Sequence, residues 1–289
     1  MKKTSKFSKI LIYIPLIILA VTIIVPVFWV FMASIKENVE FYRNPWALPA
    51  GIHLQNFADA WAKADMGSYM LNSVIVTALA LFLLVIISLP ASYVLSRFEF
   101  KSRGFWNTLF MAGLFINVNY IVVPIFLMLN DADIFLRKLG GEGFFLNNIF
   151  VLAVIYAATA LPFTIYLLSG YFKTVAKDYE EAAYVDGAGY FRTMVQIIIP
   201  MAKPSIITVI LFNFLSFWNE YIISMTMLTK AELKTLPVGL MNLMAAQKSA
   251  VQYGQMYAGL VIVMLPTLIL YMCVQKNLTK GMTVGGLKG

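Results

Sequence analysis

The sequence predicts an all-α integral membrane protein with six transmembrane helices, both termini in the cytoplasm, and a cytoplasmic helix–turn–helix segment between helices four and five. Of its 289 residues, 61% are hydrophobic and only 12% are charged, whereas soluble domains carry about 25% charged residues. Six apolar segments are long enough to cross a bilayer, which takes about 20 residues in a helix. A long polar stretch, residues 173–203, follows the fourth of them. We expect residues 1–289 to form one transmembrane domain.

The six expected spans cover residues 10–33, 69–95, 105–130, 144–172, 204–229 and 252–275. The first is too long for the apolar region of a signal peptide and lacks a convincing small-residue cleavage site. We therefore expect it to remain in the membrane. With six spans, the two termini and the loops after spans two and four share one side of the bilayer.

The lysines and arginines are distributed unevenly between the two sides. The side with the termini carries 14 of the 22 basic residues and five acidic residues, while the opposite loops hold eight of each. The side richer in lysine and arginine is cytoplasmic in membrane proteins, which places residues 173–203 in the cytoplasm. The overall positive charge has this membrane explanation, and no basic–aromatic module for nucleic acid is present.

The polar stretch opens with the pattern of a short helix. Asp178 and Glu181 have the spacing of a capping box, and acids in a first turn suit the helix dipole. An apolar face should follow, formed by Ala182, Ala183 and Val185.

The helix should end at two glycines, because Gly tolerates the positive φ of a sharp turn. These are Gly187 and Gly189. A second amphipathic stretch, residues 190–199, should leave at an angle and stop at Pro200 and Pro204.

This stretch resembles the EAA loop of permease subunits in binding-protein-dependent ABC importers. The matching positions are Glu181, Ala182, Ala183, Asp186, Gly187, Ala188, Ile197 and Pro200. That family usually has Leu before the first proline, where this chain has Ile199. We call residues 173–203 the coupling loop, because the resemblance implies that its residues 181–183 and 186–188 sit in a cleft of an ATPase subunit.

Other stretches are similar to the carbohydrate-importing branch, in particular its maltose-type second permease subunit. They are PWALP at 45–49, NSVIVT at 72–77, SRFEFKSRG at 96–104, FWNEY at 217–221, TLPVGL at 235–240 and the C-terminal GMTVGGLKG. The resemblance spans the chain, so we expect a complete subunit. It implies import of an oligosaccharide or related carbohydrate across a bacterial or archaeal cytoplasmic membrane. It also implies a second homologous permease, two ATPase subunits and an extracytoplasmic solute-binding protein as partners.

The chain has no GxxxxGK[ST] phosphate loop, so ATP and Mg²⁺ should bind to the separate ATPase subunits. With a single histidine, His53, and a single cysteine, Cys273, it offers no catalytic constellation and no thiolate metal cluster. We expect a non-catalytic subunit without a cofactor of its own.

Glu220 is the only Asp, Glu, Lys or Arg within the expected spans. A charged side chain in a membrane helix is costly and is expected to face the bundle interior, a water-filled cavity or a partner. Asn213, Ser216 and Asn219 lie on a broadly similar helical face. These four residues are candidates for the wall of a translocation path, where amides and hydroxyls would meet sugar hydroxyls. A structural hydrogen-bond cluster between helices is the alternative.

Two loops on the side of the membrane opposite the termini also contain patterns that predict a structure or a contact. In residues 34–68, the spacing of Phe57, Ala60, Trp61 and Ala64 predicts an amphipathic helix at the membrane surface. In residues 230–251, the resemblance implies contact with the external binding protein, after a rigid turn at TLPVGL. The candidate contacts are Met241, Leu243, Met244, Gln247 and Lys248; a plain linker is the alternative.

Other transport classes remain to be weighed. An ABC importer for peptides, polyamines or glycerol phosphates is the closest alternative. A secondary transporter would need an ion-coupling site and usually an internal repeat, and the sequence shows one intramembrane acid and no obvious repeat. The sequence gives still less support to a membrane-embedded enzyme.

Overall fold

The computed structural model describes residues 6–63, 65–246 and 251–286, and the secondary structure within these ranges is entirely helical. The chain folds as two compact units. Unit one comprises residues 1–67 and 239–265, and unit two comprises residues 68–238 and 266–289. Each unit has the structure that follows within the described ranges.

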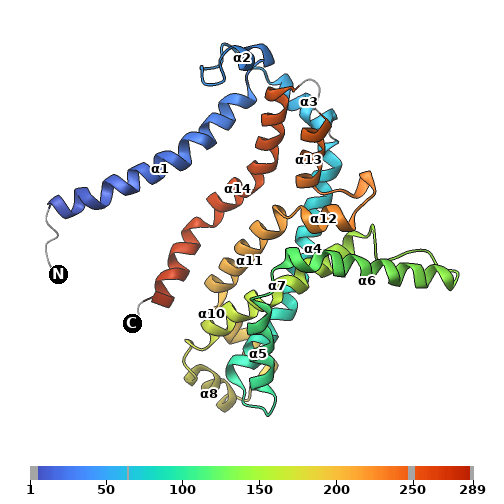
Figure 1. The fold of residues 1–289 in the computed structure, drawn as a ribbon. Helices are drawn as coiled ribbons and strands as arrows, with labels where there is room; N and C mark the ends of the chain where they lie inside the picture. The colour runs from blue at the N-terminus through green and yellow to red at the C-terminus, as the bar shows by residue number, and fades with distance from the viewer. Residues whose placement is uncertain (1–5, 64, 247–250, 287–289) are drawn as a thin grey trace. The chain divides into compact units, whose positions relative to one another are not determined.

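Unit one contains α1 (Lys6–Ser34), α2 (Asn38–Arg43) and α3 (Gln55–Lys63), together with parts of α13 (Leu236–Ala246) and α14 (Tyr253–Gly286) (Figure 1). Most of α1 exposes its apolar side chains, as expected of a helix that lipid or a partner helix would cover. Its C-terminal end is different, because Trp29 packs there against an aromatic cluster from α2, the loop after α2 and α14. The other rings are Phe41, Trp46, Tyr253 and Tyr257.

The amphipathic pattern of residues 57–64 is realised as α3 within unit one. Ala60 is fully buried and Trp61 is half-exposed, which gives the helix one packed and one open face. Ala64 lies outside the described residues.

Unit two holds the long helices α4 (Met66–Arg97), α6 (Val118–Lys138), α7 (Ile149–Phe172) and α11 (Lys203–Trp218) (Figure 1). Shorter elements connect them: α5 (Arg103–Gly113), α8 (Asp178–Val185), α9 (Tyr190–Thr193), a π-helix (Met194–Ile198), α10 (Ile199–Met201), α12 (Ile222–Met227) and a 3₁₀ turn (Ala231–Leu233). α7 is the most buried of the candidate spans. It contributes to two apolar clusters, one shared with α6 and α12 and the other shared with α4, the π-helix and α11. α8 and α5 lie at the same end of this unit.

Five described helices are long and apolar enough to cross a membrane, and a bent pair brings the number to six. They cover Leu11–Ser34, Met66–Arg97, Val118–Lys138, Ile149–Phe172 and Tyr253–Gln275, and the bent pair is Tyr190–Met201 with Lys203–Trp218, which turn by 76°. The predicted all-helical, multi-span architecture is therefore confirmed at this level of detail.

The third expected span, residues 105–130, is divided in the structure. α5 ends at Gly113, and α6 begins at Val118 and runs on to Lys138, into the stretch expected to be an outer loop. A Cβ on Gly113 would lie 2.7 Å from Pro162 of α7, so the helices approach closely there. Asn117 then starts the new helix, since its Oδ1 accepts a hydrogen bond from the backbone N–H of Asn119 at 3.0 Å.

The fifth expected span, residues 204–229, is also divided, because α11 ends at Trp218 and α12 begins at Ile222. Nor does the helix before it stop at Pro200. α9 continues through the π-helix and α10 as far as Met201. A proline inside an α-helix removes one hydrogen bond and clashes with the carbonyl four residues earlier. The wider π turn immediately before Pro200 accommodates that ring.

Two side chains fix the connection between α6 and α7. The buried carboxylate of Asp133 accepts hydrogen bonds from the backbone N–H groups of Phe144, Phe145 and Leu146, at 2.7, 2.8 and 2.9 Å. Asn147, with φ of 54°, accepts from the backbone N–H groups of Thr229 and Lys230 at 2.7 and 2.9 Å. This end of unit two is thereby tied to the residues that follow α12.

Candidate functional site

A cavity of about 440 Å³ lies within unit two between α7, α11 and the start of α6. Its lining combines amides, hydroxyls and one carboxylate with aromatic rings. The polar members are Asn117, Asn119, Thr159, Asn213, Ser216 and Glu220, and the aromatic members are Tyr156, Phe163, Phe212 and Phe217. Such a lining can hydrogen-bond a polyhydroxylated molecule and pack against its apolar faces.

Glu220 lies in the break between α11 and α12, where its carboxylate accepts three hydrogen bonds. Oε1 accepts from the backbone N–H of Ile223 at 2.7 Å, and Oε2 accepts from that of Ser224 at 3.0 Å. The hydroxyl of Tyr156 on α7 donates to Oε2 at 2.7 Å. The side chain therefore caps α12 and joins it to α7, and these bonds offset the cost of placing a charge in a membrane protein.

Asn213 links the same two long helices nearer the middle of α11. Its buried side-chain amide donates to Oγ1 of Thr164 on α7 at 3.0 Å and to the carbonyl of Val209 at 2.8 Å. A polar bond between packed helices is the structural role considered for this cluster. Because Asn213 also lines the cavity, the structural and the path-lining roles are compatible for this residue.

The structure brings three of the four candidate path residues to one cavity wall: Asn213, Ser216 and Glu220. The fourth, Asn219, is exposed, and its side-chain amide donates to the carbonyl of Leu215 in its own helix at 2.8 Å.

The sequence analysis missed Asn117, Asn119, Tyr156 and Thr159, which line the same cavity. Asn117 and Asn119 flank Val118 inside an otherwise apolar run. These two asparagines in an apolar run were the sequence signal both for a polar site and for the start of a helix. Tyr156 and Thr159 carried no comparable signal, because a single hydroxyl is common in an apolar helix.

The coupling loop carries its exposed face on α8. Glu181, Ala182 and Asp186 are exposed, and Val185 is 86% exposed. Ala183 is buried, so the apolar face expected from Ala182, Ala183 and Val185 is not packed as one surface. The expected capping box is absent as well, since Lys177 precedes α8 and makes no side-chain cap bond.

α8 ends in a Schellman motif at Gly187. The backbone N–H of Gly187 donates to the carbonyl of Tyr184 at 3.0 Å, and that of Ala188 donates to Ala183 at 2.9 Å. Gly187 has φ of +79°, whereas Gly189 has φ of −75° and precedes α9 in extended conformation. Only Gly187 therefore needs the conformational freedom of glycine.

A buried ion pair attaches α8 to the end of α4. Nε of Arg97 lies 3.3 Å from Oε1 of Glu180, and the two side chains are only 5% and 10% exposed. Nη2 of Arg97 also donates to the carbonyl of Val175 at 2.6 Å, in the loop before α8. The sequence analysis counted Arg97 among the basic residues that set the orientation in the membrane, and it did not identify this pair. Burial, together with the Glu180 carboxylate, raises the pKa of the neighbouring Tyr184 hydroxyl, which keeps it protonated.

The outer residues proposed to contact a binding protein lie on a helix, since TLPVGL leads into α13 and does not form a turn. Pro237 is the second residue of α13, a position where its missing N–H costs nothing. Met241 and Met244 are half-exposed, whereas Leu243 is buried and close to Gly259 of α14. Gln247 and Lys248 lie outside the described residues.

The sequence has known relatives. Residues 88–284 match the family described as binding-protein-dependent transport system inner membrane component. The diacetylchitobiose uptake system permease protein NgcG of Streptomyces coelicolor is 34% identical over 93% of this chain and 86% of its own length. The trehalose/maltose transport system permease protein MalG of Thermococcus litoralis is 29% identical over 98% of each chain.

The fold has a counterpart among solved structures. A chain of a bacterial ABC transporter involved in the import of the acidic polysaccharide alginate superposes with a TM-score of 0.78, at 23% sequence identity, over 96% of this chain and 99% of that one. The family match and the sequence relatives show that the chain belongs to the family of inner-membrane permease components of binding-protein-dependent ABC transport systems.

Proposed function

We propose that this chain is one of two homologous permease subunits of an ATP-driven importer for an oligosaccharide or a related carbohydrate. The observation that carries the proposal is the cavity between α7 and α11, with its amides, hydroxyls and aromatic rings. Relatives named for the uptake of diacetylchitobiose and of trehalose and maltose support the same substrate class.

The charges at the cavity favour a neutral solute over the other substrates considered. No lysine or arginine is among its described lining residues, which disfavours glycerol phosphates. Its one carboxylate, Glu220, already accepts three hydrogen bonds and is poorly placed to bind a polycation such as a polyamine. Uncharged hydroxyl groups are the best match to the remaining amides and hydroxyls.

The exposed face of α8 supports a second part of the proposal, in which an ATPase subunit holds the coupling loop. The other partners are a second ATPase subunit, the second permease and an extracytoplasmic binding protein, and the cytoplasmic membrane is the location. ATP and Mg²⁺ belong to the ATPase subunits. Met241 and Met244 on α13 are the described residues best placed to meet the binding protein, since both are half-exposed and methionine adapts to a partner surface.

Two connections would carry motion from α8 into the rest of unit two. The Arg97–Glu180 pair joins α8 to the last turn of α4, and α9, the π-helix and α10 join it along the chain to α11. A displacement of α8 with the ATPase would then shift α4 and α11, and α11 lines the cavity. Switching between inward- and outward-facing states follows from such rigid-body movement.

The test is uptake by the complete transporter, with substitutions at Ser216. Ser216→Trp should fill the cavity and abolish uptake of labelled oligosaccharide while the complex still assembles and retains basal ATPase activity. Ser216→Ala, at the same position, removes only one hydroxyl, leaves the cavity open and should retain most of the uptake. Oligosaccharide uptake by Ser216→Trp at the wild-type rate, or competition by a polyamine or a glycerol phosphate but not by oligosaccharides, would overturn the proposal.

A further inference from the structure

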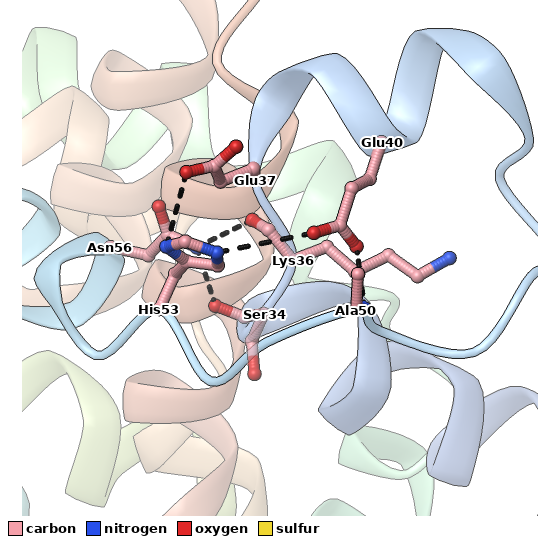
Figure 2. Close-up of polar contacts among 7 residues, drawn as sticks. All are labelled: Ser34, Lys36, Glu37, Glu40, Ala50, His53 and Asn56. Carbon is pink, nitrogen blue, oxygen red and sulfur yellow. Dashed lines mark hydrogen bonds and ion pairs between the residues drawn. The ribbon is translucent and has the colours of Figure 1, made fainter.

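The segment between α1 and α3 in unit one holds His53 between two glutamates (Figure 2). Nδ1 of His53 lies 3.5 Å from Oε1 of Glu37, and Nε2 lies 3.9 Å from Oε1 of Glu40. One ligand atom from each of the three residues can be chosen such that all lie within 4.8 Å of one another. This is the only such group of three among the described residues.

The backbone that carries these side chains is fixed independently of them. The N–H of His53 donates to the carbonyl of Ile35 at 2.9 Å. Nδ2 of Asn56 donates to the carbonyls of Ser34 and Lys36, at 2.9 and 2.8 Å (Figure 2). Glu37 directly precedes α2, and Glu40 lies in its first turn, so the two carboxylates share one side of that helix.

Two of the three side chains also border open space. A hollow of about 430 Å³ is lined by Glu37, Glu40 and neighbouring residues of the same segment, including Arg43. A Cβ on Gly51 would lie 3.3 Å from Nε2 of His53, so glycine leaves the approach to that nitrogen free. The side chain of Lys36 points away from His53 in Figure 2, and its ammonium donates to the carbonyl of Pro45 at 2.9 Å.

We propose that Glu37, Glu40 and His53 bind one divalent transition-metal ion of the zinc class. One imidazole nitrogen and one oxygen from each carboxylate would serve as ligands, and water from the hollow would complete the coordination. Imidazole suits zinc, nickel and copper, whereas calcium and magnesium prefer oxygen ligands alone. The proposal does not depend on the transport function.

The geometry requires only small movements of the side chains. Ligands bound tetrahedrally at zinc distances lie roughly 3.3 Å apart, and one ligand atom from each of the three residues already lies within 4.8 Å of the other two. The side chains of Glu37 and His53 are 56% and 35% exposed and are free to rotate by this amount. A bound ion would cross-link α2 to the loop before α3 and hold this segment of unit one rigid.

The test uses the full chain in its transporter complex, purified with a tag that contains no histidine and stripped with a chelator. Titration with Co²⁺, followed by its visible absorption, should reveal one saturable site from which Zn²⁺ displaces the cobalt. His53→Gln and Glu40→Gln should each weaken this binding by about tenfold or more. Glu232→Gln, which alters another exposed carboxylate, should bind as the wild type does.

Two further measurements keep the result decisive. Unfolding temperatures in chelator should match between wild type and variants, which shows that the segment still folds. Gly51→Val keeps all three ligands but narrows the approach to Nε2, and it should also weaken binding. Cobalt binding that is identical in wild type and His53→Gln, or no saturable site in the wild type, would overturn the proposal.

Discussion

The hydroxyl of Tyr156 in α7 donates a 2.7 Å hydrogen bond to the carboxylate of Glu220, which lies just before α12 and caps its first turn. Both residues line the cavity of unit two, and the Tyr156 ring stacks on Phe217 with centroids 5.4 Å apart. One contact therefore couples the cavity wall to the break between α11 and α12.

Tyr156→Phe should keep the stacking and lose only the hydrogen bond. A hydrogen bond to a charged group contributes about 1.5–3 kcal/mol. The free energy of unfolding of the complex should therefore fall by about that amount, and the apparent KM for oligosaccharide should rise. Tyr171→Phe is the matched control, because Tyr171 lies in the same helix and donates to the carbonyl of Met201. Its loss should cost about 1 kcal/mol and leave KM unchanged. Equal KM shifts in the two variants would contradict a specific role for Tyr156.

The glycines of the coupling loop should differ in their tolerance of a side chain. Gly187→Val places a β-branched residue at φ of +79° and should cost about 1–3 kcal/mol of local strain. Gly189→Ala should be nearly neutral, because φ is −75° and nothing lies within 4 Å of an added Cβ. Co-purification of the ATPase subunits measures the effect, and it should fall for Gly187→Val alone. A greater loss for Gly189→Ala would show that the turn geometry is misassigned.

The Arg97–Glu180 pair should be sensitive to removal of either partner and tolerant of removal of both. Breaking a buried pair by deleting one charge costs about 3–5 kcal/mol, whereas replacing both charges by apolar residues is often neutral for stability. Arg97→Met alone should therefore destabilise the purified complex strongly, and Arg97→Met with Glu180→Met should recover most of the loss. Additive effects of the two substitutions on thermal unfolding would rule out a direct interaction.

The topology follows from the lysine and arginine distribution and is testable by labelling. In a Cys273→Ala background, cysteines at Ser102 and Thr174 should resist an impermeant thiol reagent in intact cells. A cysteine at Ala231 should react. All three positions are exposed in the structure, so accessibility within the fold does not bias the comparison. External labelling of the Thr174 position would reverse the assigned orientation.

The sequence predicted what depends on local pattern. Apolar length identified the spans, and the glycine after residues 178–185 marked the end of α8, where the structure has a positive φ. The division at Gly113 was not predictable from the apolar run, because it depends on the close approach to Pro162 of α7. The continuation through Pro200 was missed for a related reason, since proline stops an α-helix but follows a π turn here.

The candidate site was predicted in part. Glu220 stood out because a charge in an apolar span is costly, and Asn213 and Ser216 followed from helical spacing. Tyr156 could not be found in this way, because its partner Glu220 lies 64 residues away and only the packing of α7 against α11 brings them together. Arg97 and Val175, 78 residues apart, meet for the same reason. Pairings between distant segments require the tertiary structure.

Docking of the exposed face of α8 on an ATPase subunit is the step on which the proposed coupling depends. Its most direct test is a photo-crosslinking amino acid at Val185, which is 86% exposed, compared with the same group at Phe115, which is 87% exposed in the link between α5 and α6. Irradiation of the assembled transporter should join the Val185 position to the ATPase, identified by mass spectrometry, and the Phe115 position should give no such product. Absence of an ATPase crosslink from Val185, or equal crosslinking from both positions, would contradict the account.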